Sequence, residues 1–132
     1  MATDGMTPNL VCATTAVPPY RCCLINGIRT GTIATTGLVP VVGVSDGSTP
    51  IYSNTTNNAE IGGPINFQQG NTVQIEAGAA FNAGVALMPT TGGKVITAVG
   101  AGAFSSYVAL ETSGADGEIV WCYRCIGKTF LT

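Results

Sequence analysis

The chain has 132 residues, of which 45% are hydrophobic and only 9% are charged, and its formal net charge is -2. This length predicts one domain with a shorter segment outside it, and the charged fraction is far below the roughly 25% of typical soluble domains. The few lysines and arginines are scattered and no apolar run approaches the length of a membrane span, so the composition argues against nucleic acid and against membrane as partners.

A surface with so few charges has two explanations. Either threonine, asparagine and serine keep it hydrated, or partner molecules cover much of it, and we favour partners because low charge protects a monomer poorly from self-association. The first residues of the chain have neither the basic start nor the apolar run of a signal peptide. We therefore expect synthesis in the cytoplasm.

Residues 1–30 differ from the rest of the chain and predict an extended N-terminal arm that can include a first strand. Pro8, Pro18 and Pro19 disfavour a helix, and hydrophobic alternation is weak. A frayed terminus is one interpretation, but the segment is apolar enough to dock on a neighbouring molecule. The residues that suggest docking are Val11, Val17, Tyr20, Leu24 and Ile25.

Residues 31–132 predict a compact domain that is mainly β, a small antiparallel β-sandwich or barrel-like module. Short apolar runs bounded by Gly, Thr, Asn and Ser are typical of half-buried strands. Asn26-Gly27 predicts a hairpin turn between strands at 22–25 and 28–33, and Pro40 suggests that the run 38–44 is an edge or a bend. Further strands are expected at 73–75, 94–98, 107–110 and 119–123.

Chemistry-bearing residues are few. The chain has no histidine, which removes the commonest catalytic base and metal ligand, and no pair of carboxylates suggests acid–base catalysis. Cys122 and Cys125 form a CxxC that could complete a four-sulfur zinc site with Cys22 and Cys23, but adjacent residues of a strand point to opposite faces. We therefore expect reduced structural thiols, no metal, no cofactor and no enzymatic activity.

Large aromatic side chains near the C-terminus are candidates for a subunit contact, since aromatics dominate such interfaces. They are Trp121, Tyr123 and Phe130. On a strand, Trp121 and Tyr123 share one face while Cys122 and Arg124 share the other, and either face can be the core.

The order of several motifs resembles that of the small capsid decoration, or cement, proteins of tailed phages. The matching pieces are Val42-Gly43-Val44, VQIEAGAAFNAGVAL at 73–87, Gly92-Gly93-Lys94-Val95 and VALETSGADGEIV at 108–120. The chain departs from the family pattern at Val85, where an acidic residue is common, and in the closing strand, which carries Trp121, Cys122 and Cys125. The resemblance implies a non-enzymatic β-rich protein, often a symmetric oligomer, on the outside of an icosahedral shell.

The leading hypothesis is thus a capsid decoration protein of the virion that binds the outer surface of the phage head. Its partners would be the major capsid protein and further copies of itself, as a dimer or trimer. The alternative is a ligand- or carbohydrate-binding β module of a virion surface or tail, with the loop 53–58 and exposed Trp or Tyr residues as its site. A third hypothesis is a structural subunit that assembles by itself.

Overall fold

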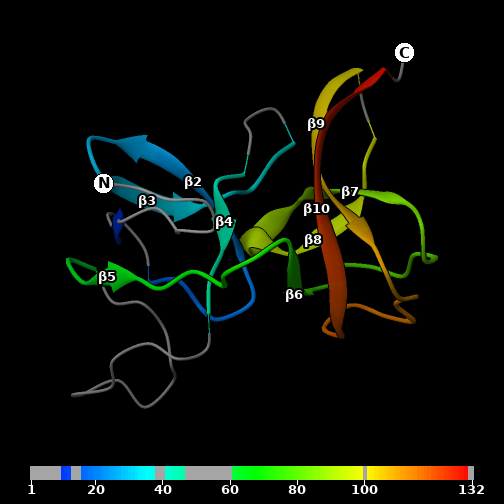
Figure 1. Ribbon diagram of the computed structural model, residues 1–132, viewed down its shortest axis with the longest axis horizontal. Helices are drawn as coiled ribbons and strands as arrows, with labels where there is room; N and C mark the ends of the chain where they lie inside the picture. Colours follow the sequence, from blue (N-terminus) through cyan, green and yellow to red (C-terminus); the bar gives the residue numbers. More distant parts are fainter. Residues whose placement is uncertain (1–9, 13–15, 38–40, 47–60, 100, 131–132) are drawn as a thin grey trace.

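The computed structural model describes residues 10–12, 16–37, 41–46, 61–99 and 101–130, without the side chains of 64, 101–104 and 126–130 (Figure 1). Within these residues the fold is mainly β, as the short apolar runs predict, and the strands form two five-stranded sheets. A 3-10 turn, η1 (Thr91–Gly93), is the sole helical element of this part of the chain. The sandwich or barrel-like prediction is therefore confirmed.

The first sheet is mixed and is assembled from short strands in the order β4-β2-β3-β1-β5. In it β1 runs parallel to β3 and antiparallel to β5, so the most N-terminal strand lies inside the sheet. We call this half of the molecule the first lobe. Its strands are β1 (Leu10–Cys12), β2 (Cys22–Gly27), β3 (Thr30–Ile33), β4 (Gly43–Val44) and β5 (Pro64–Ile65).

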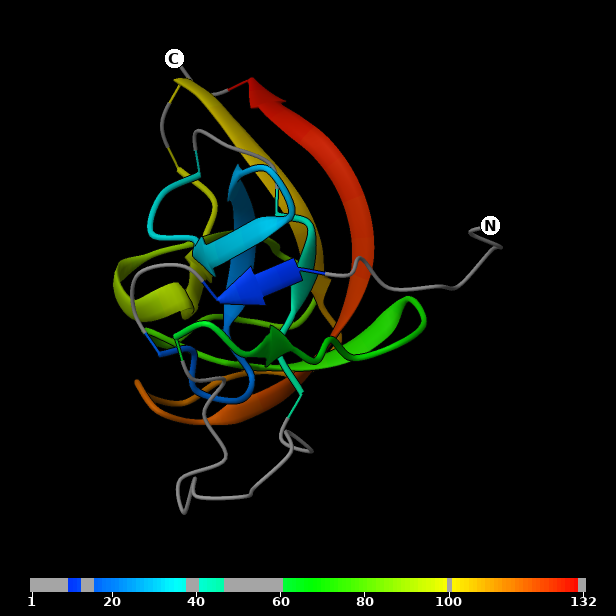
Figure 2. The same ribbon diagram turned by 90° about the vertical axis from the view of Figure 1, so that its left-hand side faces the viewer.

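The second sheet is antiparallel, has the order β6-β10-β9-β7-β8, and closes on itself. Just after β6, Ala77 forms a bridge with Val95 of β8, and the Gly78 amide donates to the Val95 carbonyl over 2.8 Å. We call this lobe the barrel; it lies beside the first lobe in Figure 1 and behind it in Figure 2. Its strands are β6 (Thr72–Glu76), β7 (Ala86–Pro89), β8 (Val95–Thr97), β9 (Ala101–Ala109) and β10 (Ile119–Phe130).

The hairpin between β2 and β3 forms as expected, but its turn lies elsewhere. Asn26 and Gly27 belong to the end of β2, and the chain reverses at Ile28 and Arg29, where Arg29 has φ 55. A register shift between Ile25 and Gly27 accommodates this displacement. The prediction of a turn at Asn26-Gly27 was therefore wrong by two residues. The edge position expected after Pro40 is confirmed, since β4 ends the first sheet.

Two hydrophobic cores result, one on each face of the first sheet. The larger core fills the barrel and includes Cys22, Val41 and Val44 from the first lobe, so it also joins the lobes. The smaller core lies within the first lobe and contains six buried residues: Leu10, Cys12, Val17, Cys23, Ile65 and Phe67. Alternation along β2 explains the division, because Cys22 points to one core and Cys23 to the other.

The described part of the expected arm, 10–12 and 16–30, belongs to the first sheet of the same chain. Leu10, Cys12 and Val17 are 5%, 1% and 0% exposed and supply half of the smaller core. These apolar side chains are thus buried against other residues of the same chain and not against a neighbouring molecule. Residues 1–9 and the loop 53–58 lie outside the described residues.

Candidate docking surfaces and the junction between the lobes

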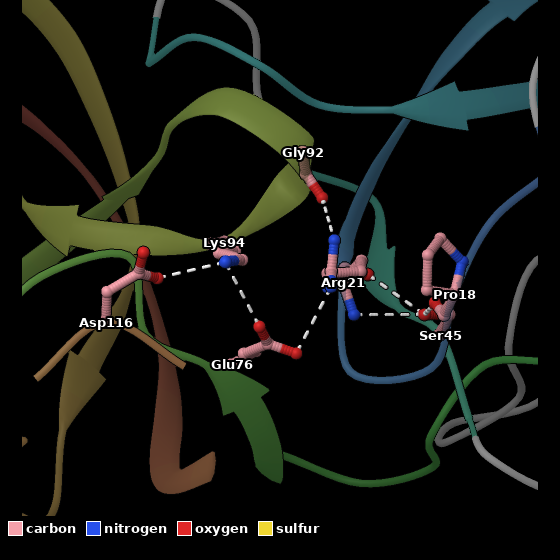
Figure 3. Close-up of polar contacts among 7 residues, drawn as sticks. All are labelled: Pro18, Arg21, Ser45, Glu76, Gly92, Lys94 and Asp116. Atoms are coloured by element: carbon pink, nitrogen blue, oxygen red, sulfur yellow. Dashed lines mark hydrogen bonds and ion pairs between the residues drawn. The ribbon is translucent and has the colours of Figure 1, made fainter. Parts of the chain in front are cut away.

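A row of charged side chains joins the lobes (Figure 3). The Glu76 carboxylate, at the end of β6, lies 3.2 Å from Arg21 Nη2 through one oxygen and 3.2 Å from Lys94 Nζ through the other. Lys94 Nζ also bonds Asp116 Oδ1 at 2.9 Å, and this hydrogen bond, followed by that to Glu76, raises the pKa of Lys94. Arg21 reaches across from the first lobe and donates from Nη1 to the Gly92 carbonyl over 2.8 Å.

One backbone hydrogen bond crosses the same junction, and three bonds within the first lobe position Tyr20 and Arg21 for it. The Tyr20 carbonyl accepts from the Glu76 amide and the Tyr20 amide donates to the Ser45 carbonyl, both at 3.0 Å. Tyr20 adopts φ 64, a left-handed conformation that costs a residue with a side chain about 1–3 kcal/mol. The buried Ser45 hydroxyl donates to the Pro18 carbonyl over 2.6 Å and accepts from the Arg21 amide over 3.0 Å (Figure 3). The lobes are therefore fixed relative to one another by interlocking bonds.

Two of the motifs that resemble those of decoration proteins meet at this junction. Glu76 belongs to the first and Lys94 to the second, and both contain glycines that the close packing requires. A Cβ on Gly78 would lie 2.9 Å from Thr90 Cγ2, and one on Gly93, which has φ +79, would lie 2.7 Å from Ile33 Cγ2. These motifs thus have a structural role in this chain: they build the barrel and attach the first lobe to it.

The described cations are largely engaged inside the molecule. Besides Arg21 and Lys94, Arg124 donates from Nη1 to the Tyr107 hydroxyl over 2.9 Å and from Nη2 to the Val41 carbonyl over 3.2 Å. Its guanidinium also lies 5.6 Å from the centroid of the Tyr107 ring. Arg29 lies exposed at the hairpin turn. Three of the four cations whose side chains are described are therefore engaged within the chain.

The outer face of the barrel carries an apolar stripe along β10. Ile119, Trp121 and Tyr123 are 40%, 44% and 46% exposed, whereas Val120 and Cys122 between them are buried. Leu110, 50% exposed, lies beside the middle of the row, where its amide donates to the Trp121 carbonyl over 3.0 Å. We call these four residues the barrel stripe. The face that carries Cys122 is the core, and the face that carries the aromatic side chains is the surface.

The first lobe has a separate apolar surface around the β2–β3 turn. Ile28 at the turn is 94% exposed and Ile25 is 52% exposed. Val11, 40% exposed, is next to them, because its amide donates to the Arg29 carbonyl over 2.9 Å. Ile61, 62% exposed, is close to β1, since the Gly62 amide bonds the Cys12 carbonyl. Val11 alternates with Leu10 and Cys12 of the smaller core, whereas Ile25 lies on the same face as Cys23, so Val11 and Ile25 point to opposite faces of the first sheet. We call the exposed pair Ile25 and Ile28 the hairpin patch.

The expected interface residues therefore have different places. Ile25 belongs to the hairpin patch, Val11 is exposed on the opposite face of the first sheet, and Trp121 and Tyr123 belong to the barrel stripe. Val17 is fully buried, Leu24 packs against the larger core, and Tyr20 lies at the lobe junction. The Phe130 side chain lies outside the described residues. Sequence reasoning missed Ile28, Ile61, Leu110 and Ile119; period-two alternation from Trp121 would have included Ile119.

The cysteines do not form a common centre. Cys22 and Cys122 lie in the larger core and Cys23 in the smaller one, while Cys125 is exposed, and no disulfide joins any of the five. Burial raises the pKa of Cys22 well above its usual value and that of Cys23 and Cys122 to about 12. These three thiols stay protonated and are poor nucleophiles. Among the described residues no three His, Cys, Asp or Glu side chains gather to hold a metal ion.

Comparisons with protein-family models, with curated proteins and with solved structures found no match. The resemblance to decoration proteins remains a prediction from the motifs. The described part of the chain contains no helix with the length and hydropathy needed to span a membrane.

Proposed function

We propose that the chain is a capsid decoration, or cement, protein of a tailed phage. It binds the outer surface of the assembled head and stabilises contacts between major capsid protein subunits. It acts by binding alone, without a catalytic step and without a cofactor.

The observation that carries this proposal is the presence of two apolar surfaces on two lobes that are held rigidly together. A protein that strengthens a shell must contact at least two neighbours at once. The hairpin patch lies on the first lobe and the barrel stripe on the barrel, and the junction around Glu76 fixes the lobes. Simultaneous binding at two sites multiplies weak individual affinities.

The charge distribution and the motif order support the same function. With three of the four described cations engaged at the junction and beside Tyr107, and with a net charge of -2, the chain has little charge to attract nucleic acid or to repel a neighbouring copy. Many copies can then crowd on one shell. The order of the glycine-punctuated motifs is the order seen in decoration proteins.

Cosedimentation with empty shells assembled from the cognate major capsid protein tests the proposal. The full chain is expected to saturate the shells, and the double variant Ile25→Ser/Ile28→Ser to bind about 100-fold more weakly, because each lost isoleucine contact is worth up to about 1.5–3 kcal/mol. The control is Val99→Ser, which removes a 53%-exposed apolar side chain from the connection between β8 and β9. Absence of wild-type binding to shells would contradict the proposal.

Carbohydrate binding is the second candidate, and one observation favours it. Trp121 and Tyr123 are exposed at alternate positions of one strand and offer ring faces on which sugars can stack. Trp121 is the single tryptophan of the chain, so its fluorescence reports directly on an occupant. An emission shift with a glycan, together with no binding to shells, would favour this candidate over the first.

A further inference from the structure

The long strands β9 and β10 continue beyond the barrel as a two-stranded ribbon. β6 pairs with β10 over residues 119–123 alone, and β7 pairs with β9 at Tyr107 and Val108. The pairing of β9 with β10 goes on as far as Phe130, which lies opposite Ala101. Figures 1 and 2 show this part of the two strands reaching past the others toward the C-terminus. We call residues 101–106 and 125–130 the ribbon.

The β10 edge of the ribbon has no neighbouring strand in the described part of the chain. On this side β10 is occupied up to Arg124, whose amide donates to the Asn71 carbonyl over 2.7 Å. The residue before Asn71 is Gly70, with φ 86, and the Gln68 amide already bonds the first lobe. Residues 125–130 thus continue along a line that the chain leading into β6 has left, and no described strand pairs with them there.

The β9 edge of the ribbon is covered where it leaves the barrel. Ser105 and Ser106 are 5% and 1% exposed. The Ser106 hydroxyl accepts a hydrogen bond from the Val41 amide over 3.4 Å, so a segment of the first lobe packs here. On the β10 side, in contrast, Tyr123 is 46% exposed and Cys125 is exposed. The accessible edge is therefore that of β10.

An open strand edge has a specific ligand chemistry. It presents backbone N–H and C=O groups in a row, and the backbone of an extended segment matches this row with its own N–H and C=O groups. A two-stranded ribbon is also only marginally stable in water, and a third strand stabilises it. The edge therefore favours an extended polypeptide over a sugar, a membrane or a nucleic acid.

The shape of the edge favours a flexible segment over another folded sheet. The pairing of β10 with β9 shifts register between Arg124 and Gly127 and again between Lys128 and Phe130. Such bulges bend a strand, increase its twist and hinder pairing with the edge of another folded sheet. A second copy of the chain presents the same bent edge, so two copies fit each other poorly. A segment that belongs to no sheet of its own can follow the bend.

We propose that residues 125–130 of β10 form a strand-addition site for a flexible, extended segment of another protein. The segment runs antiparallel to β10, in line with β6 and in the same direction. Its residues carry little charge, because Arg124, at the base of the site, is already bound to Tyr107 and to the Val41 carbonyl. The inference goes beyond the proposed function and does not depend on it, since the hairpin patch is not part of this edge.

Amide hydrogen exchange of the full chain, followed residue by residue by NMR, tests the inference. The probe is an octapeptide of alternating threonine and valine with a lysine at each end, a composition that favours an extended backbone. At saturating, millimolar peptide, amides within 125–130 should exchange about tenfold more slowly, and those of β2 and β3 should be unchanged. A control peptide with proline at its two central positions loses a donor on each edge and should bind at least tenfold more weakly.

Several results would overturn the inference. One is exchange within 125–130 that the peptide does not slow, and another is equal protection by both peptides. Slow exchange of these amides in the chain alone would show that its own residues already cover the edge. Trp121→Ser should bind the peptide like wild type, and loss of binding in this variant would place the peptide on the barrel stripe instead. Shell binding is measured separately with the Ile25→Ser/Ile28→Ser variant, so the two proposals fail independently.

Discussion

The barrel is built from one continuous stretch of the chain, whereas the first lobe is assembled from separate short stretches. The barrel uses one stretch, from β6 to β10, and its ring of strands closes through the bridge between Ala77 and Val95. The first lobe gathers short strands from before residue 46 and after residue 61, and one of its pairings is parallel. Its sheet also closes, because Ser45 after β4 forms a bridge with Phe67 after β5 and the Gln68 amide donates to the Val44 carbonyl over 2.9 Å.

The two lobes therefore differ in their expected contributions to stability and to binding. In each sheet the three inner strands have a partner on both sides, but the larger core, which fills the barrel, includes residues of both lobes. The first lobe has a smaller core of six buried residues and carries the most exposed apolar side chain, Ile28. We infer that the barrel is the stable scaffold and that the first lobe presents a surface attached to it.

Truncating one buried side chain in each core should give the largest difference in the free energy of unfolding. Ile75→Ala in the barrel is expected to lower the free energy of unfolding by about 2–5 kcal/mol, because it leaves a cavity in the core shared by both lobes. Leu10→Ala, in the smaller core, should cost close to the lower limit of that range, since fewer buried side chains surround it. Urea titrations followed by Trp121 fluorescence provide the measurement. Equal losses would contradict the assignment of the barrel as scaffold.

Breaking the junction should have the next largest effect. Glu76→Gln removes the anion that Arg21 and Lys94 share and is expected to cost about 1.5–3 kcal/mol, the usual range for hydrogen bonds to charged groups. Glu118→Gln is the control, because Glu118 is exposed and bonds only the Gly114 amide among the partners seen, so a change within about 0.5 kcal/mol is expected. If the two variants unfold at the same urea concentration, the junction does not hold the lobes together.

The buried thiols should make the folded state sensitive to alkali. The pKa of Cys23 is about 12 in the folded chain, while an unfolded thiol ionises near a pKa of about 8.5. The stabilisation is complete below about pH 8.5 and is lost as pH rises toward 12, at about 1.4 kcal/mol per pH unit for this group. Cys23→Ala should lessen the slope of unfolding free energy against pH, and Cys125→Ala, at an exposed position, is the comparison. Identical slopes would exclude a buried, protonated Cys23.

The last prediction concerns the rates at which the five thiols are labelled, and it needs no substitution in the chain. Cys125 is exposed and the other four cysteines are buried, so one thiol should react with an aromatic disulfide reagent within the mixing time. The four others should react only as fast as the chain unfolds. Faster labelling of Cys12 and Cys23 than of Cys22 and Cys122 would show that the first lobe opens on its own. Immediate labelling of all five would contradict both cores.

The two lobes also differ in how far sequence predicts them. Local apolar runs and glycine turns predicted β6 and β8 and parts of β9 and β10, but not β7 or the full lengths of β9 and β10. The opposite orientations of Cys22 and Cys23 follow from strand geometry. The parallel pairing of β1 with β3 and the bond between Arg21 and Glu76 join residues far apart in the chain, and no local signal specifies them. The turn at Asn26-Gly27 was misplaced because pairing with β3 outweighed the local turn preference.

The most direct test of the central claim, that the chain connects neighbours through two surfaces, is an electron cryomicroscopy map of cognate shells saturated with the protein. We expect the chain on the outside of the shell, with the hairpin patch of the first lobe against the major capsid protein and the barrel stripe against another neighbouring molecule. A saturated sample whose shells carry no density for the chain, or carry it with the hairpin patch facing solvent, would contradict the account.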